Sequence, residues 1–221
     1  MSIFIIGGTG LTGAEFVKHA QNASAISNIT TLGRRTIEGA KINSIVESDT
    51  SKWAKIIKEN GKESSAFFSA FGTTRAQAGG LENFKKIDID VNIDAAKAAK
   101  EAGIETYVLV SSGAASSGSM VPYLKLKGQL EDEVIALKFK NTIILRPGVL
   151  LGDRTSNKGF LNNLGVYLGK ATKNIWYGLL SPTEASDVAK VGLSLVLKTG
   201  SESKGVQILE AAEITKLAKE L

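Results

Sequence analysis

The sequence predicts an α/β protein: one doubly wound parallel sheet of the Rossmann type, with helices on both faces. Three observations predict it. Short β-branched runs alternate with longer amphipathic stretches along the chain, which is typical of parallel strands joined by helical crossovers. A glycine-rich turn follows the first of these runs directly. The 221 residues suffice for one core without covalent staples. We therefore expect a single domain over 1–221 with a small C-terminal extension on the substrate side.

Six strands and the helices between them complete two βαβαβ halves by Arg146. The expected strands are Ile3 to Ile6, Ile29 to Leu32, Ile42 to Glu47, Ala66 to Ala70, Thr106 to Val110 and Thr142 to Leu145. The expected helices are Leu11 to Gln21, Ser51 to Glu59, an Ala- and Asp-rich helix ending near Gly103, and Val121 to Lys138. Trp53, Ile56 and Ile57 are expected to anchor the second of these helices.

The pattern loosens after Arg146. Residues 151–182 are expected to be irregular, followed by a helix from Glu184 to Leu197, a strand from Val206 to Leu209 and a last helix. Additions after the sixth strand of a doubly wound sheet lie beyond the carboxyl ends of the strands, where ligands bind. We expect 151–182 to form a segment over the substrate.

Composition excludes several chemistries. With no Cys, the chain has no disulfide, no thiolate nucleophile and no Cys-ligated metal. Its single histidine, His19, excludes two-His metal sites, so no metal is predicted, and His19 is expected to be a polar helix residue. The net charge of +5 comes with no nucleic-acid recognition motif. No apolar stretch is long enough to span a membrane. Because the glycine turn comes so early, we expect no cleaved leader.

The turn over 7–13 has glycines at the spacing G-x-x-G-x-x-G. Such a turn gives a tight bend, a close backbone approach to a pyrophosphate, and close packing of helix on strand, with the helix N-terminus facing the phosphates. Its place between the first strand and the first helix predicts a dinucleotide site. The residues expected to contact the cofactor here are Gly7, Thr9, Gly10, Leu11, Thr12 and Gly13.

The end of the second strand predicts which dinucleotide binds. An NAD-selective site places a carboxylate there for the ribose 2′-hydroxyl, whereas this chain has Arg34 and Arg35. Guanidinium groups match a 2′-phosphate, so NADP(H) is favoured, with a solvated loop as the alternative. Asp49, just past the third strand, is a candidate for the adenine amino group or a solvated loop residue.

Tyr123 and Lys127 are spaced i, i+4 on an expected helix, which places both on one face. A neighbouring ammonium stabilises a phenolate and moves the phenol toward its working range. The preceding strand ends at Ser111 and Ser112. A Ser hydroxyl there can hydrogen-bond a carbonyl oxygen while Tyr123 delivers the proton.

These motifs resemble atypical short-chain dehydrogenase/reductases. Gly33-Arg34-Arg35, the Thr73-Thr74-Arg75 block and Arg146-Pro147-Gly148 are similar to the fungal Found-in-Mitochondrial-Proteome protein 52 group and its animal relative, the Tat-interacting oxidoreductase. The resemblance covers nearly the whole chain. It implies an NADP-binding Rossmann fold and, for fungal members, a peripheral place on the cytosolic face of the mitochondrial outer membrane.

The resemblance also implies residue roles. Tyr123 would be the acid/base, Lys127 would bind the nicotinamide ribose, and Ser112, or alternatively Ser111, would polarise the carbonyl. Asn92 is the nearest candidate for a fourth catalytic residue, with a structural role as the alternative. Residues that would line the cofactor are Ala70, Phe71, Gly72 and Pro147.

Two functions remain open. The first is an NADPH-dependent reductase of a small carbonyl compound; the second is a nucleotide sensor in which NADPH orders 151–182. The stretch 154–183 has basic and aromatic residues and no carboxylate, which suits either an anionic membrane surface or a substrate lid.

Overall fold

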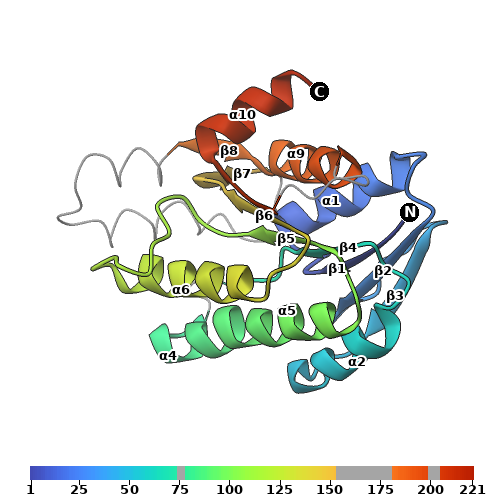
Figure 1. The fold of residues 1–221 in the computed structure, drawn as a ribbon, viewed down its shortest axis with the longest axis horizontal. Helices are drawn as coiled ribbons and strands as arrows, with labels where there is room; N and C mark the ends of the chain where they lie inside the picture. The colour runs from blue at the N-terminus through green and yellow to red at the C-terminus, as the bar shows by residue number, and fades with distance from the viewer. Residues whose placement is uncertain (74–77, 153–180, 199–204) are drawn as a thin grey trace.

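Seven parallel strands form one sheet in the order β3-β2-β1-β4-β5-β6-β9 in a computed structural model of the chain (Figure 1). The structure describes residues 1–73, 78–152, 181–198 and 205–221. This strand order reverses direction between β1 and β4, as in doubly wound dinucleotide-binding folds. The predicted fold class is therefore confirmed.

Each expected strand is present, with ends that shift by at most one residue. The strands of the large sheet are β1 (Ser2–Ile6), β2 (Asn28–Gly33), β3 (Ile42–Val46), β4 (Ala66–Ser69), β5 (Thr106–Val110), β6 (Asn141–Arg146) and β9 (Gly205–Glu210). The longer helices are α1 (Leu11–Asn22), α2 (Trp53–Asn60), α5 (Val91–Glu101), α6 (Pro122–Ala136), α9 (Ala185–Lys198) and α10 (Ala211–Lys219).

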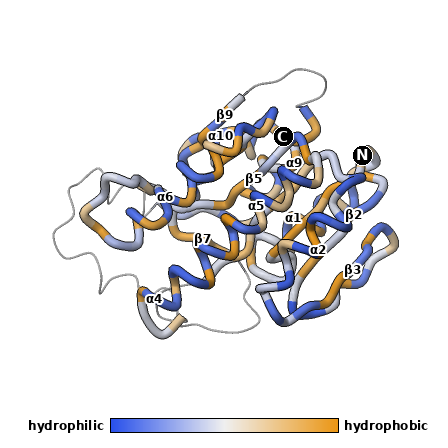
Figure 2. The backbone as a smooth tube through the Cα atoms, turned by 60° about the horizontal axis from the view of Figure 1, so that its bottom comes forward, coloured by the Kyte–Doolittle hydropathy of each residue, from blue (hydrophilic) through white to orange (hydrophobic). Residues whose placement is uncertain are grey.

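The sheet separates two hydrophobic layers. In β1, Ile3 and Ile5 pack into one core cluster, and Phe4 and Ile6 into the other, as the alternation of side chains along a strand requires. Helices α1, α9 and α10 cover the first face, and α2, α5 and α6 cover the second (Figure 1). Figure 2 shows hydrophobic and hydrophilic residues alternating along α5 and α6, as expected of helices with one buried face.

Two features depart from the expected elements. Val149–Leu151 (β7) pairs in parallel with Pro182–Glu184 (β8), so both ends of the stretch expected to be irregular are short strands. Three-residue strands are too short to show a period in the sequence. The rest of that stretch, 153–180, lies outside the described residues. Its expected roles, as a substrate lid or as a membrane-binding surface, therefore stay predictions.

The second departure is a π-helical turn, η2 (Lys85–Asp90), between α4 (Leu81–Phe84) and α5. The sequence predicts only a helix ending near Gly103, whose φ of +86° allows the chain to turn there. π-Helical turns are rare and are found frequently at functional sites. Asp88 on this turn and Asn92 at the start of α5 are both buried polar residues.

His19 on α1 is a polar helix residue, as expected. Its Nε2 lies 3.0 Å from Ser186 Oγ on α9 and 4.0 Å from Glu15 Oε2. Both neighbours therefore approach the same ring nitrogen, whereas a hydrolytic triad needs the acid on Nδ1 and the serine on Nε2. Across the described residues, no helix is long and apolar enough to cross a bilayer.

Candidate functional site: a nucleotide pocket and a buried lysine

A pocket of about 120 Å³ lies at the carboxyl ends of β1, β2 and β4. Eight of the predicted cofactor residues line it: Gly7, Thr9, Gly10, Arg34, Arg35, Ala70, Phe71 and Gly72. The lining also contains residues that the sequence does not predict as cofactor contacts: Gly8, Thr31, Leu32, Gly33, Ile37 and Trp53. This edge of the sheet is where ligands bind in open α/β folds.

The glycine turn is shaped by close backbone contacts. Gly7 has φ of +79°, and a Cβ there would overlap the backbone of Ala70 and Phe71. A Cβ on Gly13 would overlap the carbonyl oxygen of Gly7, and the Gly10 N–H donates to that same oxygen at 2.9 Å. The turn therefore packs against β4 and α1 as the G-x-x-G-x-x-G spacing requires.

Several polar groups at the pocket lack partners. Helix α1 begins without a side-chain cap and without an acidic residue in its first turn, which leaves its N-terminal amides for an anion. The buried hydroxyls of Thr31, in the pocket wall, and Thr12, in the first turn of α1, have no hydrogen-bond partner among the described residues. Because buried polar groups are normally paired, the Thr31 hydroxyl fits a bound nucleotide, whereas Thr12 lies outside the pocket lining.

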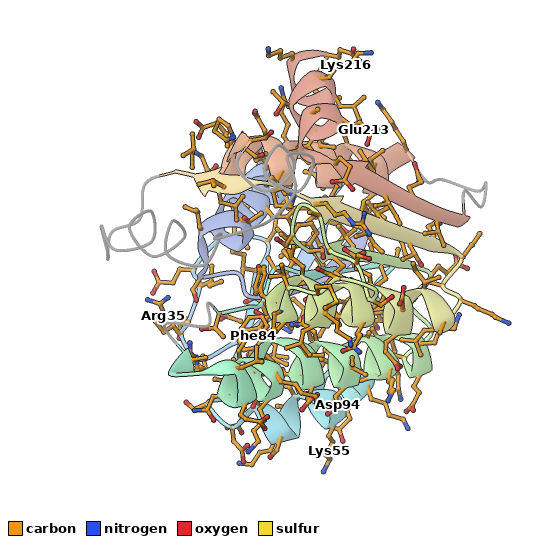
Figure 3. The ribbon with its side chains drawn as sticks, turned by 90° about the vertical axis from the view of Figure 1, so that its left-hand side faces the viewer. Arg35, Lys55, Phe84, Asp94, Glu213 and Lys216 are labelled. Atoms are coloured by element: carbon orange, nitrogen blue, oxygen red, sulfur yellow. The ribbon has the colours of Figure 1, made fainter. Side chains whose placement is uncertain are left out.

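Arg34 and Arg35 place two guanidinium groups on the rim of the pocket. Arg35 Nη2 donates to the Thr9 carbonyl at 3.3 Å, so this side chain lies over the glycine turn. Figure 3 shows Arg35 at the molecular surface.

Asp49 lies outside the pocket lining. It caps the η1 turn (Thr50–Lys52) by accepting from Ser51 Oγ at 2.6 Å and Ser51 N at 3.0 Å, which lowers the pKa of Asp49. Its contact with adenine stays a prediction.

Two aromatic side chains of the pocket lining, Trp53 and Phe71, contact each other. The Trp53 indole packs edge-on against Phe71, with ring centroids 4.9 Å apart, and its Nε1 donates to the Glu47 carbonyl at 3.0 Å. The sequence identifies Trp53 only as the residue that anchors α2. Trp53 is far from the glycine turn in the sequence, so the sequence alone does not predict that it lines the pocket.

A second polar cluster lies between η2 and α6. Lys127 is buried, and its Nζ lies 2.5 Å from Asp88 Oδ1. Burial opposes the charge on Lys127, but Asp88, Tyr123 and Glu131 outweigh it, so the pKa of Lys127 is raised. Lys127 is therefore an ammonium at neutral pH, and its charge interacts with the Tyr123 phenol, as the i, i+4 spacing predicts. Tyr123 is half-buried against Phe84, at 5.3 Å between ring centroids.

Ser111 and Ser112 follow β5 and are both buried. Ser112 Oγ donates weakly to the Gly113 carbonyl at 3.4 Å, whereas Ser111 Oγ has no partner within the described residues. The missing partner favours Ser111 over Ser112 as the donor to a ligand. Pro147 lies outside the pocket lining; its carbonyl accepts from the Gly113 N–H at 2.7 Å and ties the ends of β5 and β6 together. Its contact with nicotinamide stays a prediction, as does the choice between the two serines.

Asn92 is fully buried, and its side-chain amide is committed to the protein. Its Nδ2 donates to the carbonyls of Phe71 at 3.0 Å and Asp88 at 2.6 Å, and its Oδ1 accepts from Ser69 Oγ. This favours the structural alternative for Asn92. The described residues contain no group of three or more His, Cys, Asp or Glu placed to hold a metal ion.

Comparisons with known proteins show an NAD(P)H-binding family. A family described as NAD(P)H-binding matches residues 7–176. "Protein FMP52, mitochondrial" of Candida albicans is 48% identical over the whole of both chains. The protein of the same name in Saccharomyces cerevisiae is 43% identical, over all of this chain and 98% of the relative.

Solved structures show the same fold at low identity. The oxidoreductase ylbE from Lactococcus lactis has a TM-score of 0.69 at 16% identity, covering all of this chain and 96% of that one. MoeE5 in complex with UDP-glucose and NAD has a TM-score of 0.68 at 17% identity, covering all of this chain and 81% of that one.

Proposed function

The chain belongs to the FMP52 family of NAD(P)H-binding proteins, and from that premise we propose that it is an NADPH-dependent oxidoreductase of the short-chain dehydrogenase type that reduces a small carbonyl compound. The observation that favours an enzyme is the buried Lys127 ammonium acting on Tyr123. A protein that only held a nucleotide would not need a buried cation beside a phenol.

The pocket residues fit a dinucleotide with a 2′-phosphate. The amides at the start of α1 would hold the pyrophosphate, and Arg34 and Arg35 would hold the 2′-phosphate by charge-assisted hydrogen bonds. The orphan hydroxyl of Thr31 would find its partner on the bound nucleotide. NADPH, once bound, supplies a hydride to the carbonyl carbon.

The chain supplies the proton and the charge. The Tyr123 hydroxyl would donate its proton to the carbonyl oxygen, leaving a phenolate that solvent reprotonates. The fixed charge of Lys127 stabilises that phenolate, and no rearrangement is needed because the ammonium is already in place. The Ser111 hydroxyl would donate to the same carbonyl oxygen. Phe84, packed on the Tyr123 ring, excludes water from one side of it.

NADPH should stabilise the protein against heat more than NADH does at equal concentration, because only NADPH offers a phosphate to the two arginines. Replacing both Arg34 and Arg35 by glutamine should lower the affinity for NADPH by about 10- to 100-fold and leave that for NADH unchanged. Thermal shift and isothermal calorimetry measure both.

Lys55→Gln is the matched control for lost positive charge. Lys55 is 80% exposed on α2 and projects far from Arg35 in Figure 3. This variant should bind both nucleotides as the unaltered protein does. A larger stabilisation by NADH, or an equal loss for both nucleotides in the double arginine variant, would contradict the assignment of the 2′-phosphate.

We further propose that the protein is peripheral to the cytosolic face of the mitochondrial outer membrane; the relatives' names, which call them mitochondrial, support the organelle. In fractionated cells it should sediment with mitochondria and be released by alkaline carbonate. External protease should digest it while the mitochondria are intact. Protection from protease until the outer membrane is broken would place it inside the organelle instead.

A further inference from the structure

The Asp88 carboxylate lies between the nucleotide pocket and the Lys127 cluster. Asp88 is 1% exposed. One oxygen, Oδ1, accepts from Lys127 Nζ at 2.5 Å, and the other, Oδ2, accepts from the Thr73 N–H at 2.7 Å. Thr73 directly follows Ala70, Phe71 and Gly72, which line the pocket. One buried side chain therefore links Lys127 to the loop that continues from the pocket lining.

The chain around Asp88 is shaped to allow this contact. A Cβ on Gly72 would lie 2.7 Å from Asp88 Oδ2, so only glycine lets the loop after β4 approach the carboxylate this closely. Asn92 links the loop after β4 to η2, because its Nδ2 donates to the carbonyls of both Phe71 and Asp88. The π-helical turn displaces Asp88 from regular α-helical register.

The other charges near Lys127 have partners of their own. Glu131, one turn further along α6, is held by Arg146, with Nε–Oε1 at 3.0 Å and Nη2–Oε2 at 2.5 Å. Arg146 also binds Glu210, at 2.8 Å. Tyr123, the remaining titratable group acting on Lys127, is a phenol. Asp88 is thus the carboxylate available to balance the buried ammonium.

We propose that Asp88 is a positioning residue: its carboxylate holds the Lys127 ammonium in place and charged beside Tyr123, and at the same time fixes the pocket loop through the Thr73 N–H. The functional part of this proposal rests on the proposed reductase. The structural part does not, because the charge on Lys127 and the affinity of the pocket can each be measured without turnover.

The direct test is the proton state of Lys127 in the full-length protein with Asp88→Asn. An asparagine keeps the size and an acceptor for Thr73 but removes the counter-ion, so burial should lower the pKa of Lys127. In protein labelled with ¹³C at lysine Cε, the Lys127 signal, assigned by its loss in Lys127→Met, should titrate below about pH 9 in Asp88→Asn. In the unaltered protein it should stay protonated throughout that range. An unchanged Lys127 titration would overturn the proposal.

Asp90→Asn is the matched control. Asp90 lies on the same π-helical turn, two residues on, and pairs with the half-exposed Lys85 at 3.1 Å. Its loss should change neither the Lys127 signal nor NADPH binding. If Asp88→Asn fails to fold, Gly72→Ala tests the same link without a change of charge, because its methyl group would push the carboxylate away. In Gly72→Ala too, an unmoved Lys127 titration would overturn the proposal.

Activity separates this proposal from the proposed function. In an active protein, Asp88→Asn should lower kcat and weaken NADPH binding. It should also make kcat decrease with rising pH, because Lys127 then loses its proton. The double variant Asp88→Asn/Lys127→Met should regain stability, since no buried charge is left unpaired, without regaining kcat. If the unaltered protein reduces none of a panel of aldehydes and ketones, the reductase assignment fails while the Lys127 titration still decides the role of Asp88. Normal kcat and pH dependence in Asp88→Asn would overturn the positioning role.

Discussion

Turnover of a carbonyl substrate should fall by about 10²- to 10⁴-fold when Tyr123 is replaced by phenylalanine. The substitution removes one hydroxyl and keeps the ring that packs on Phe84, so the fold should be unaffected. The affinity for NADPH should not change, because Tyr123 lies outside the lining of the nucleotide pocket. Consumption of NADPH, followed by absorbance under single-turnover conditions, measures the chemical step directly.

Tyr107→Phe is the matched control. Tyr107 is a fully buried core residue of β5, stacked on Phe67. Burial raises the pKa of Tyr107 well above its ordinary value, so the phenol is neutral at working pH. This variant should keep full turnover. If Tyr123→Phe keeps it as well while NADPH still binds, the acid assigned here is wrong. A protein that binds NADPH but reduces no carbonyl would instead favour the nucleotide sensor.

The strands and the phosphate turn could be predicted because their signals are local. Ile3 to Ile6 is a continuous apolar run, as a strand buried on both faces requires, and the glycines at 7, 10 and 13 follow it immediately. Gly7 is required by its contact with Ala70 and Phe71, which follow β4, and Gly13 by its contact with the Gly7 carbonyl oxygen. The pair of Tyr123 and Lys127 was likewise visible, because helical spacing alone places them on one face.

Asp88 and Trp53 could not be assigned to the site, because their roles depend on contacts between distant segments. Asp88 and Lys127 are 39 positions apart in the sequence. The burial of Asp88 depends on a π-helical turn, which no hydrophobic periodicity in the sequence predicts. An aspartate in a helix that also carries Asp90 and Asp94 reads as part of a solvated face. Trp53 reads as a core anchor, which it also is. In both cases the missing information is the packing of η2 and α2 against the ends of the strands.

Replacing Gly13 by alanine should lower the affinity for NADPH by at least about 100-fold, equivalent to about 2.7 kcal/mol. The added Cβ would overlap the Gly7 carbonyl oxygen, which also accepts the Gly10 N–H. Backbone cannot yield as the end of a flexible side chain can, so α1 must move away from the turn and its N-terminal amides must move with it. Forcing a methyl group into such a contact should also cost about 1–3 kcal/mol of unfolding free energy. Calorimetry with NADPH and urea unfolding measure the two effects.

Gly33→Ala is the matched control. It adds a methyl group to the pocket wall without disturbing the contact between Gly13 and Gly7. Gly33 lines the same pocket, but a Cβ there meets no protein atom within 4 Å and its φ is not in the left-handed region. Its substitution should leave the unfolding free energy unchanged or slightly raised, since alanine restricts the unfolded chain more than glycine does. The affinity should fall far less than in Gly13→Ala. Equal losses in the two variants would mean that the wall of the pocket, and not the contact between Gly13 and Gly7, governs nucleotide binding.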